Sequence, residues 1–148
     1  MNQLRRELTV RRPIRGVFSF FSDAANLQRI TPPWLHFKIP TPLPVTMTEG
    51  ATIAYALRLH GIPIRWLTEI EEWNPPWQFV DIQRQGPYRF WRHTHRFSEA
   101  DGGTRIEDQV DYALALGLLG RAVHRFQVAR DLAEIFDYRA SVARQIFG

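Results

Sequence analysis

The C-terminal stretch Leu118–Phe147 constrains the fold most, because it is the only long segment whose apolar residues recur every three or four positions. This spacing predicts one long helix with an apolar stripe and an opposite polar stripe. The middle of the apolar stripe is alanine rather than leucine, and alanines leave room that larger side chains would fill. We therefore expect the helix to lie over a cavity. The apolar stripe comprises Leu119, Ala122, Phe126, Ala129, Ala133, Phe136, Ala140, Ala143 and Phe147.

The length of 148 residues predicts a single domain, residues 1–148, with enough core to fold without disulfides or metals. The chain has no cysteine, which excludes thiol chemistry and is compatible with a cytoplasmic location. Its N-terminus is too charged for a signal sequence, and no apolar run approaches the length of a membrane span. The net charge of +4 comes without a dense basic run, so we do not expect nucleic-acid binding.

The first third of the chain predicts one strand, two short helices and a loop. Leu4–Arg11 alternates apolar and polar residues, as a strand does. Pro13 then begins a helix, and Asp23 is the expected N-cap of a second short helix. Five prolines in Thr31–Pro44 exclude a central strand there, so we expect a loop around a short extended piece, Leu35–Ile39.

Four or five strands joined by tight turns are expected from Ala51 to Leu114. A turn at Gly61-Ile62-Pro63 would pair His60 with Pro63. That antiparallel register places three pairs on one face: Leu57 with Trp66, Tyr55 with Thr68, and Ile53 with Ile70. Across a later turn, pairing Phe97 with Ile106 places three further pairs opposite each other: Trp91 with Tyr112, His93 with Val110, and His95 with Asp108.

The motifs that fit this order of elements are spread over nearly the whole chain: Val10, Pro13, Val17-Phe18, Phe21, Asp23, Asn26-Leu27, Gly50, Trp73, Pro75-Pro76, Phe97 and Gly102-Gly103-Thr104. The pattern resembles the START-like (SRPBCC) superfamily, and in particular its polyketide cyclase/dehydrase and coenzyme-Q-binding-like branch. The resemblance implies an α+β helix-grip fold. A curved antiparallel sheet of about seven strands would wrap around the long helix and enclose a cavity for lipids, sterols, quinones or polyketides. It carries over no catalytic residue, because the superfamily shares no catalytic motif.

The most unusual strand carries Arg89, Trp91, His93, His95 and Phe97 on one face, with Asp81 and Asp108 on neighbouring strands. Three interpretations compete. His93, His95 and a carboxylate could bind a metal, or Asp108 could orient His95 as a general acid/base, with His93 as a further candidate. We favour the third, a hydrogen-bonded cluster that fixes the register and lines a pocket. We therefore expect no metal. No glycine-rich phosphate loop is present, so we also expect no cofactor.

Four aromatic residues share the expected inward face and could form a wall for a flat or hydrophobic ligand: Tyr55, Trp66, Trp91 and Tyr112. On the long helix, Arg125 lies within the apolar arc and is expected to face the cavity, whereas Arg121 and Arg139 lie near its edge. These patterns favour a protein that binds a hydrophobic or aromatic small molecule. The alternative is a polyketide-type cyclase or dehydratase that uses a His–Asp pair.

Overall fold

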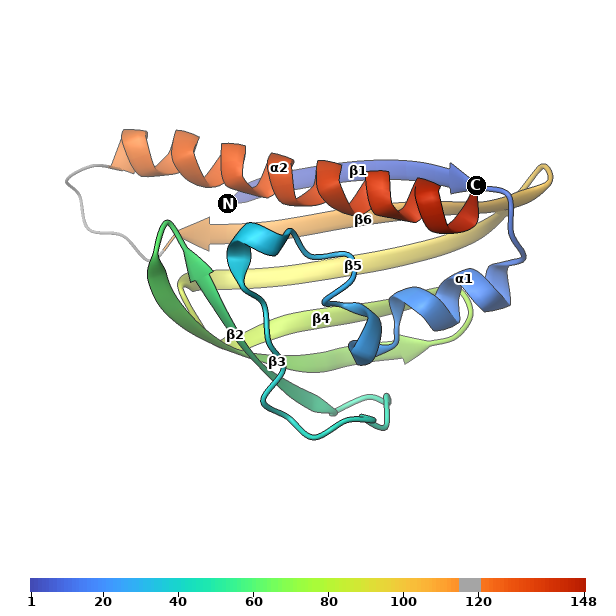
Figure 1. The fold of residues 1–148 in the computed structure, drawn as a ribbon, viewed down its shortest axis with the longest axis horizontal. Coiled ribbons are helices and arrows are strands. Elements are labelled where there is room, and N and C mark those ends of the chain that lie inside the picture. Colours follow the sequence, from blue (N-terminus) through green and yellow to red (C-terminus); the bar gives the residue numbers. More distant parts are fainter. Residues whose placement is uncertain (115–120) are drawn as a thin grey trace.

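The computed structural model describes residues 1–114 and 121–148, and in the second range it describes the side chains from residue 126 onward. One curved antiparallel sheet holds a long C-terminal helix along its length (Figure 1). The predicted α+β helix-grip architecture is therefore confirmed, while the predicted helix start at Leu118 lies outside the described residues. The elements in chain order are β1 (Asn2–Val10), α1 (Ile14–Phe21), η1 (Ala24–Asn26), η2 (Pro33–Leu35), β2 (Thr52–Leu59), β3 (Ile62–Asn74), β4 (Gln78–Gln85), β5 (Tyr88–Ala100), β6 (Gly103–Leu114) and α2 (Arg121–Phe147).

The described part of the sheet has six strands in the order β1-β6-β5-β4-β3-β2, where about seven were expected. The extended piece predicted at Leu35–Ile39 contributes only an isolated bridge between Lys38 and Ala56 of β2. The surrounding prolines explain this, since they remove the donors that a longer ladder would need. Among the described helices, none is both long and apolar enough to cross a membrane.

The register of β5 with β6 is the predicted one: Phe97 pairs with Ile106, His95 with Asp108, and Trp91 with Tyr112. The predicted register of β2 with β3 is wrong by two residues. Tyr55 pairs with Trp66 rather than with Thr68, and the other pairs shift in the same way: Leu57 with Ile64 and Ile53 with Thr68.

The shift between β2 and β3 arises at their turn, which is His60-Gly61 rather than Gly61-Ile62-Pro63. Both turn residues have positive φ, 50° for His60 and 80° for Gly61, as a two-residue hairpin turn requires. A two-residue shift keeps every side chain on its face of the sheet, so Tyr55 and Trp66 still point inward as expected.

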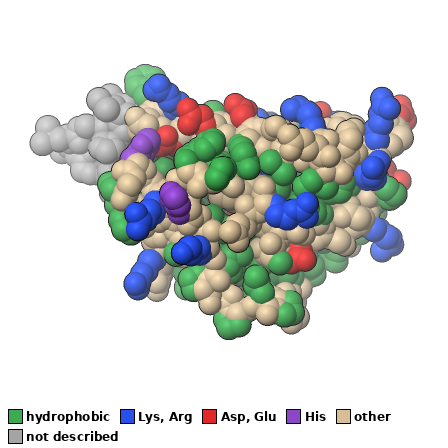
Figure 2. Space-filling view, viewed as in Figure 1, with side chains coloured by type: hydrophobic (Ala, Val, Ile, Leu, Met, Phe, Trp, Pro, Cys, Tyr) green, Lys and Arg blue, Asp and Glu red, His purple; other side chains and the backbone are tan. Residues whose placement is uncertain are grey.

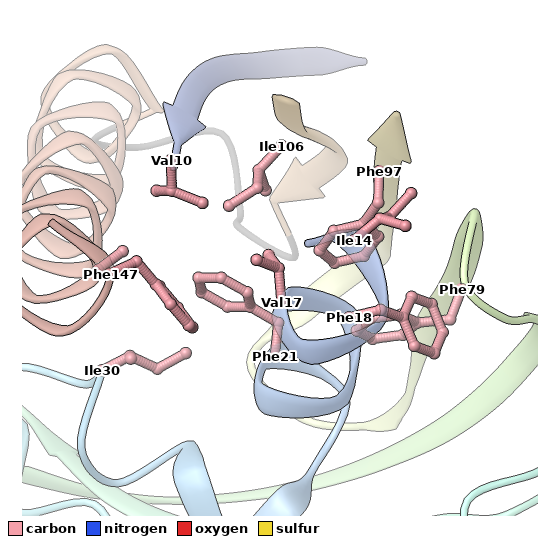
Figure 3. Close-up of a cluster of buried hydrophobic side chains, with 11 residues drawn as sticks. Val10, Ile14, Val17, Phe18, Phe21, Ile30, Phe79, Phe97, Ile106 and Phe147 are labelled. Atoms are coloured by element: carbon pink, nitrogen blue, oxygen red, sulfur yellow. The ribbon is translucent and has the colours of Figure 1, made fainter. Parts of the chain in front are cut away.

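The main core lies where α1 packs against β5 and β6 beside the C-terminal end of α2 (Figure 3). Asp23 caps η1 as predicted, because its side chain accepts a hydrogen bond from the backbone N–H of Ala25 at 2.9 Å. The cluster closes one end of the molecule with apolar side chains, which Figure 3 shows converging from several elements: Val10, Ile14, Val17, Phe18, Phe21, Ile30, Phe79, Phe97, Ile106, Ala143 and Phe147.

The inward face of α2 agrees with the predicted stripe in its C-terminal half and departs from it nearer the start. Phe136, Ala143 and Phe147 are buried as predicted, whereas Phe126 is 76% exposed and Ala129 is also exposed. Three- and four-residue steps back from Ala143 lead through Arg139 and Phe136 to the buried Leu132. Arg139 therefore lies on the buried face of the helix.

Candidate functional site

A cavity of about 190 Å³ lies between the concave face of the sheet, α2 and the segment from Leu27 to Phe37. Figure 2 shows hydrophobic side chains gathered around a hollow on this face, with basic side chains nearby. The lining is mainly apolar and aromatic, with polar side chains grouped together. It comprises Leu27, Ile30, Thr31, Leu35, Phe37, Tyr55, Leu57, Leu59, Ile64, Trp66, Thr68, Asp81, Pro87, Tyr88, Trp91, His93, His95, Asp131, Leu132, Ile135, Phe136 and Arg139.

Three of the four predicted aromatic residues line the cavity, and Tyr88 lines it in place of the fourth, Tyr112. Trp66 meets Trp91 edge-on, with ring centroids 5.0 Å apart, and Tyr88 lies 4.9 Å from Trp91. Tyr112 does not line this cavity. It lies in the cluster beneath the wall, with its ring 6.5 Å from Trp91. Tyr88, which the sequence argument missed, takes its place in the lining. Simple alternation from Trp91 would place Tyr88 on the opposite face, but the register shifts between Tyr88 and Phe90, and no clear signal of this irregularity is present in the sequence.

Trp66 and Tyr55 bring polar groups into this wall. The indole N–H of Trp66 is buried without an acceptor among the described residues. Burial raises the pKa of the Tyr55 hydroxyl and the charge of Asp81 raises it further, so Tyr55 stays a neutral hydrogen-bond donor well above neutral pH. Both residues line the cavity as the sequence predicted.

Four polar side chains from three neighbouring strands form a buried cluster at the cavity wall. The period of two along β5 puts His93 and His95 on the same inward face. Asp81 of β4 pairs in register with His93, and Asp108 of β6 pairs with His95. The two imidazole rings stack with centroids 3.6 Å apart, and His95 also stacks on Phe79 at 3.9 Å.

The hydrogen bonds of this cluster run diagonally across the strands. His95 Nε2 lies 2.6 Å from Asp81 Oδ2, and His93 Nε2 lies 2.8 Å from Asp108 Oδ1. The predicted neighbours His95 and Asp108 are adjacent, but their closest atoms, Nδ1 and Oδ1, are 3.5 Å apart. The register was therefore right, while the expected His95–Asp108 hydrogen bond is replaced by two crossed ones.

Arg139 of α2 completes the cluster, and the sequence argument had placed it only at the edge of the apolar arc. Its guanidinium lies 3.6 Å from Asp108 Oδ1 and 3.5 Å from His95 Nδ1, and only 12% of the side chain is exposed. Aromatic rings flank it, with Phe21 at 5.0 Å and Phe136 at 5.8 Å. The spacing held a signal, since Arg139 is three residues after Phe136 and four before the buried Ala143. Arg125, the predicted cavity arginine, has its side chain outside the described residues.

Burial and charge together set the protonation of this cluster. Burial opposes ionisation of both carboxyls, but it is outweighed in each. The hydrogen bond from His95, with the charges of the histidines and Arg139, lowers the pKa of Asp81. Arg139 and the hydrogen bond from His93 lower the pKa of Asp108. Burial also lowers the pKa of His95 to about 4, although Asp81 acts in the opposite direction.

These directions determine how His95 bonds at neutral pH. A neutral His95 beside an ionised Asp81 carries its proton on Nε2 and donates it to the carboxylate. Its Nδ1 then presents a lone pair to the guanidinium of Arg139. Asp108 has the guanidinium of Arg139 as a partner of opposite charge, whereas the carboxylate of Asp81 is satisfied by the hydrogen bond from His95.

The alanines of α2 leave room beneath the helix, but not in the main cavity. Ala140 and Ala143 line a second hollow of about 250 Å³ on the side of the helix facing β1 and β6, together with Asp108 and Arg139. No alanine of α2 lines the main cavity among the described residues, so that part of the prediction is wrong. Arg139 and Phe136 line both hollows, so these two side chains lie between them.

Comparison with known proteins finds similarity in structure only. No family model matches the sequence, and no curated protein sequence matches it. Among solved structures, TTHA0849 from Thermus thermophilus superposes with a TM-score of 0.78 at 17% identity, over 97% of this chain and 95% of that one. Ms6760 from Mycobacterium smegmatis matches with a TM-score of 0.71 at 17% identity, over 97% and 89% of the two chains.

A third solved structure, that of Ara h 8.0201, is also similar to this chain. Ara h 8.0201 superposes with a TM-score of 0.63 at 16% identity, over 95% of each chain. The superpositions establish a shared fold. At identities this low they do not carry an activity from one protein to another, so the activity of this chain must be argued from its own site. The chain therefore shares the helix-grip fold of these solved structures.

Proposed function

We propose that this chain binds a hydrophobic or aromatic small molecule, such as a lipid, quinone or polyketide-like compound, in the cavity between the sheet and α2. The observation that carries the proposal is the composition of the cavity wall, in which aromatic and aliphatic side chains surround one polar group of residues. Small-molecule sites commonly combine a mainly apolar wall with a few polar groups that orient the ligand.

The polar groups provide contacts for one end of the ligand. The buried indole N–H of Trp66 and the Tyr55 hydroxyl offer donors, and Asp81 offers a carboxylate oxygen. The carboxylates Asp81 and Asp108 already balance the charge of Arg139, so the cavity has no spare positive charge for an anionic ligand among its described residues. A neutral ligand with one hydroxyl or carbonyl group fits this arrangement.

Acid/base catalysis by a His–Asp pair is supported less well. A general base at neutral pH needs a pKa near that pH, whereas burial lowers the pKa of His95 to about 4. Both ring nitrogens of His95 also face partners, Asp81 on one side and Arg139 on the other. Binding without turnover therefore accounts for the cluster more simply than a cyclase or dehydratase does.

Two measurements test the proposal. Native mass spectrometry of gently purified protein should detect a copurified neutral ligand, and the delipidated protein should bind the neutral fluorescent probe N-phenyl-1-naphthylamine. Replacing Ile135, which lines the cavity, by Trp should weaken probe binding at least tenfold. The same change at the neighbouring exposed Glu134 is the matched control and should leave binding unchanged. Equal affinity in the two variants would place the probe outside the cavity and contradict the proposal.

A further inference from the structure

Three side chains at the cavity wall direct ligand-type atoms toward one point. One atom each from Asp81, His93 and His95 can be chosen so that all three lie within 4.8 Å of one another. Asp81 Oδ2 is 2.6 Å from His95 Nε2 and 3.8 Å from His93 Nδ1. Two imidazoles and one carboxylate at such distances can surround one metal ion, because ligands about 2.1 Å from a shared ion lie about 3 Å from each other.

A second carboxylate stands behind both imidazole rings. Asp108 Oδ1 lies 2.8 Å from His93 Nε2 and 3.5 Å from His95 Nδ1, which are the ring nitrogens turned away from Asp81. Histidines that bind metals commonly donate their other ring N–H to a carboxylate, which fixes the ring and raises its basicity. Asp108 Oδ1 is at hydrogen-bond distance from His93 Nε2, and a closer approach to His95 Nδ1 would let the same oxygen accept from both rings.

The charge and the surroundings of the cluster also suit a cation. Asp81 and Asp108 supply two negative charges against the one positive charge of Arg139, which lies on the Asp108 side, 3.6 Å from that carboxylate. The side chains of His93 and His95 are 7% and 4% exposed, so the rings are held rigidly by packing. All three candidate ligands line the cavity, so further coordination positions would open toward its contents.

We propose that Asp81, His93 and His95 form a binding site for one divalent transition-metal ion, with Asp108 as the hydrogen-bond acceptor behind the two imidazoles. Imidazole nitrogens with one carboxylate suit zinc, iron, cobalt or nickel and not the harder calcium or magnesium ions. On binding, the proton of His95 moves from Nε2 to Nδ1, and the guanidinium of Arg139, which lies 3.5 Å from Nδ1, turns away so that Asp108 can accept this proton. The contact between Asp81 and His95 widens to admit the ion. The site exists whether or not the cavity holds an organic ligand.

Cobalt titration of the intact chain tests this site directly. Protein stripped with EDTA and dialysed should bind one Co²⁺ per chain at neutral pH, with visible d–d absorption that an added equivalent of Zn²⁺ removes. Asp81→Asn and His93→Gln should each weaken binding at least tenfold, and Asp108→Asn should weaken it about 10- to 100-fold, the range for carboxylates behind metal-bound histidines. Circular dichroism checks that each variant is folded.

The exposed His60, which contacts Asp131 at 3.0 Å, provides the control because it could bind metal adventitiously. His60→Ala should leave the cobalt spectrum unchanged. Loss of the cobalt spectrum in His60→Ala, or its persistence in His93→Gln, would show that the ion binds at another site and would overturn the proposal. If a variant fails to fold, the wild-type titration still decides, since absence of d–d absorption at millimolar Co²⁺ also overturns it. Probe binding measured with EDTA present separates this outcome from the proposed ligand-binding function.

Discussion

Arg139 should contribute more to the stability of this protein than any exposed arginine, and Arg139→Gln tests this. The guanidinium supplies the positive charge nearest to Asp108, at 3.6 Å, and the two side chains are only 12% and 11% exposed. Glutamine keeps part of the side-chain volume but removes the charge. The substitution therefore leaves two carboxylates, Asp81 and Asp108, in a buried cluster that has lost its permanent cation.

The expected loss follows from the burial of the pair. Removing one partner of a buried ion pair typically costs about 3–5 kcal/mol, because the other charge stays buried without compensation. The separation of 3.6 Å is longer than a hydrogen bond, so we expect the low end of this range, about 3 kcal/mol. The matched control is Arg105→Gln. Arg105 pairs with Glu7 and Glu107 at 3.0 Å but is 46% exposed, and such surface pairs contribute at most about 1 kcal/mol.

Urea unfolding monitored by circular dichroism, with EDTA present throughout, measures both variants. A double-mutant cycle with Asp108→Asn adds a second criterion. Neutralising Asp108 should recover part of the loss in Arg139→Gln, with a coupling free energy of about 1–3 kcal/mol. Arg139 lowers the pKa of Asp108 in the folded state, so the stability that this pair contributes should be complete above about pH 4 and should be lost as the pH falls from there toward the lowered pKa, where the folded carboxyl becomes protonated. Equal losses for Arg139→Gln and Arg105→Gln, or no coupling with Asp108, would refute the electrostatic argument.

Two further predictions concern backbone packing and buried tyrosines. Gly103→Ala should destabilise the protein by several kcal/mol in a thermal melt, because an added Cβ would clash with the backbone carbonyl oxygen of Val10. Gly16→Ala in α1 is the control, since its Cβ meets no atom within 4 Å, and it should stabilise the protein by about 0.5–1 kcal/mol. A smaller loss for Gly103→Ala than about 1 kcal/mol would mean that the first strand shifts freely. Burial raises the pKa of Tyr55 and of Tyr88, so both should stay protonated in the folded state above about pH 10, where unfolded tyrosines ionise. The free energy of unfolding should then fall as the pH rises past about 10, and Tyr55→Phe should reduce that fall; tyrosinate absorbance that appears in full before unfolding would contradict this.

The hairpins show how far the sequence determines the sheet. The turn between β5 and β6 contains Asp101-Gly102, a pair that strongly favours a two-residue turn, and the register built from it is confirmed. The turn between β2 and β3 begins at His60, a residue that rarely adopts a positive φ, so the prediction placed the turn one residue too late. The prediction of which side chains face inward was still correct, because a shift of two residues keeps each side chain on its face of the sheet.

The polar cluster shows where sequence reasoning stops. The register predicted which strands bring His93, His95 and Asp108 together, but it fixes Cα positions and not the direction in which each side chain leans. The crossed hydrogen bonds depend on ring stacking between strands, which no spacing rule predicts. The phase of α2 was predicted correctly at Phe136, Ala143 and Phe147 but not at Phe126, which is exposed. The prediction placed Arg139 only at the edge of the apolar arc, although its side chain is 12% exposed and reaches the polar cluster.

The position of Arg139 between the two hollows has a consequence for ligand size. Phe136 is the other side chain that lines both the main cavity and the space beneath the alanines of α2. The depth available to a guest molecule therefore depends on the rotamers of these two side chains. Smaller residues at both positions would enlarge the space under the helix without a change of the backbone, so the same fold could accommodate compounds of different length.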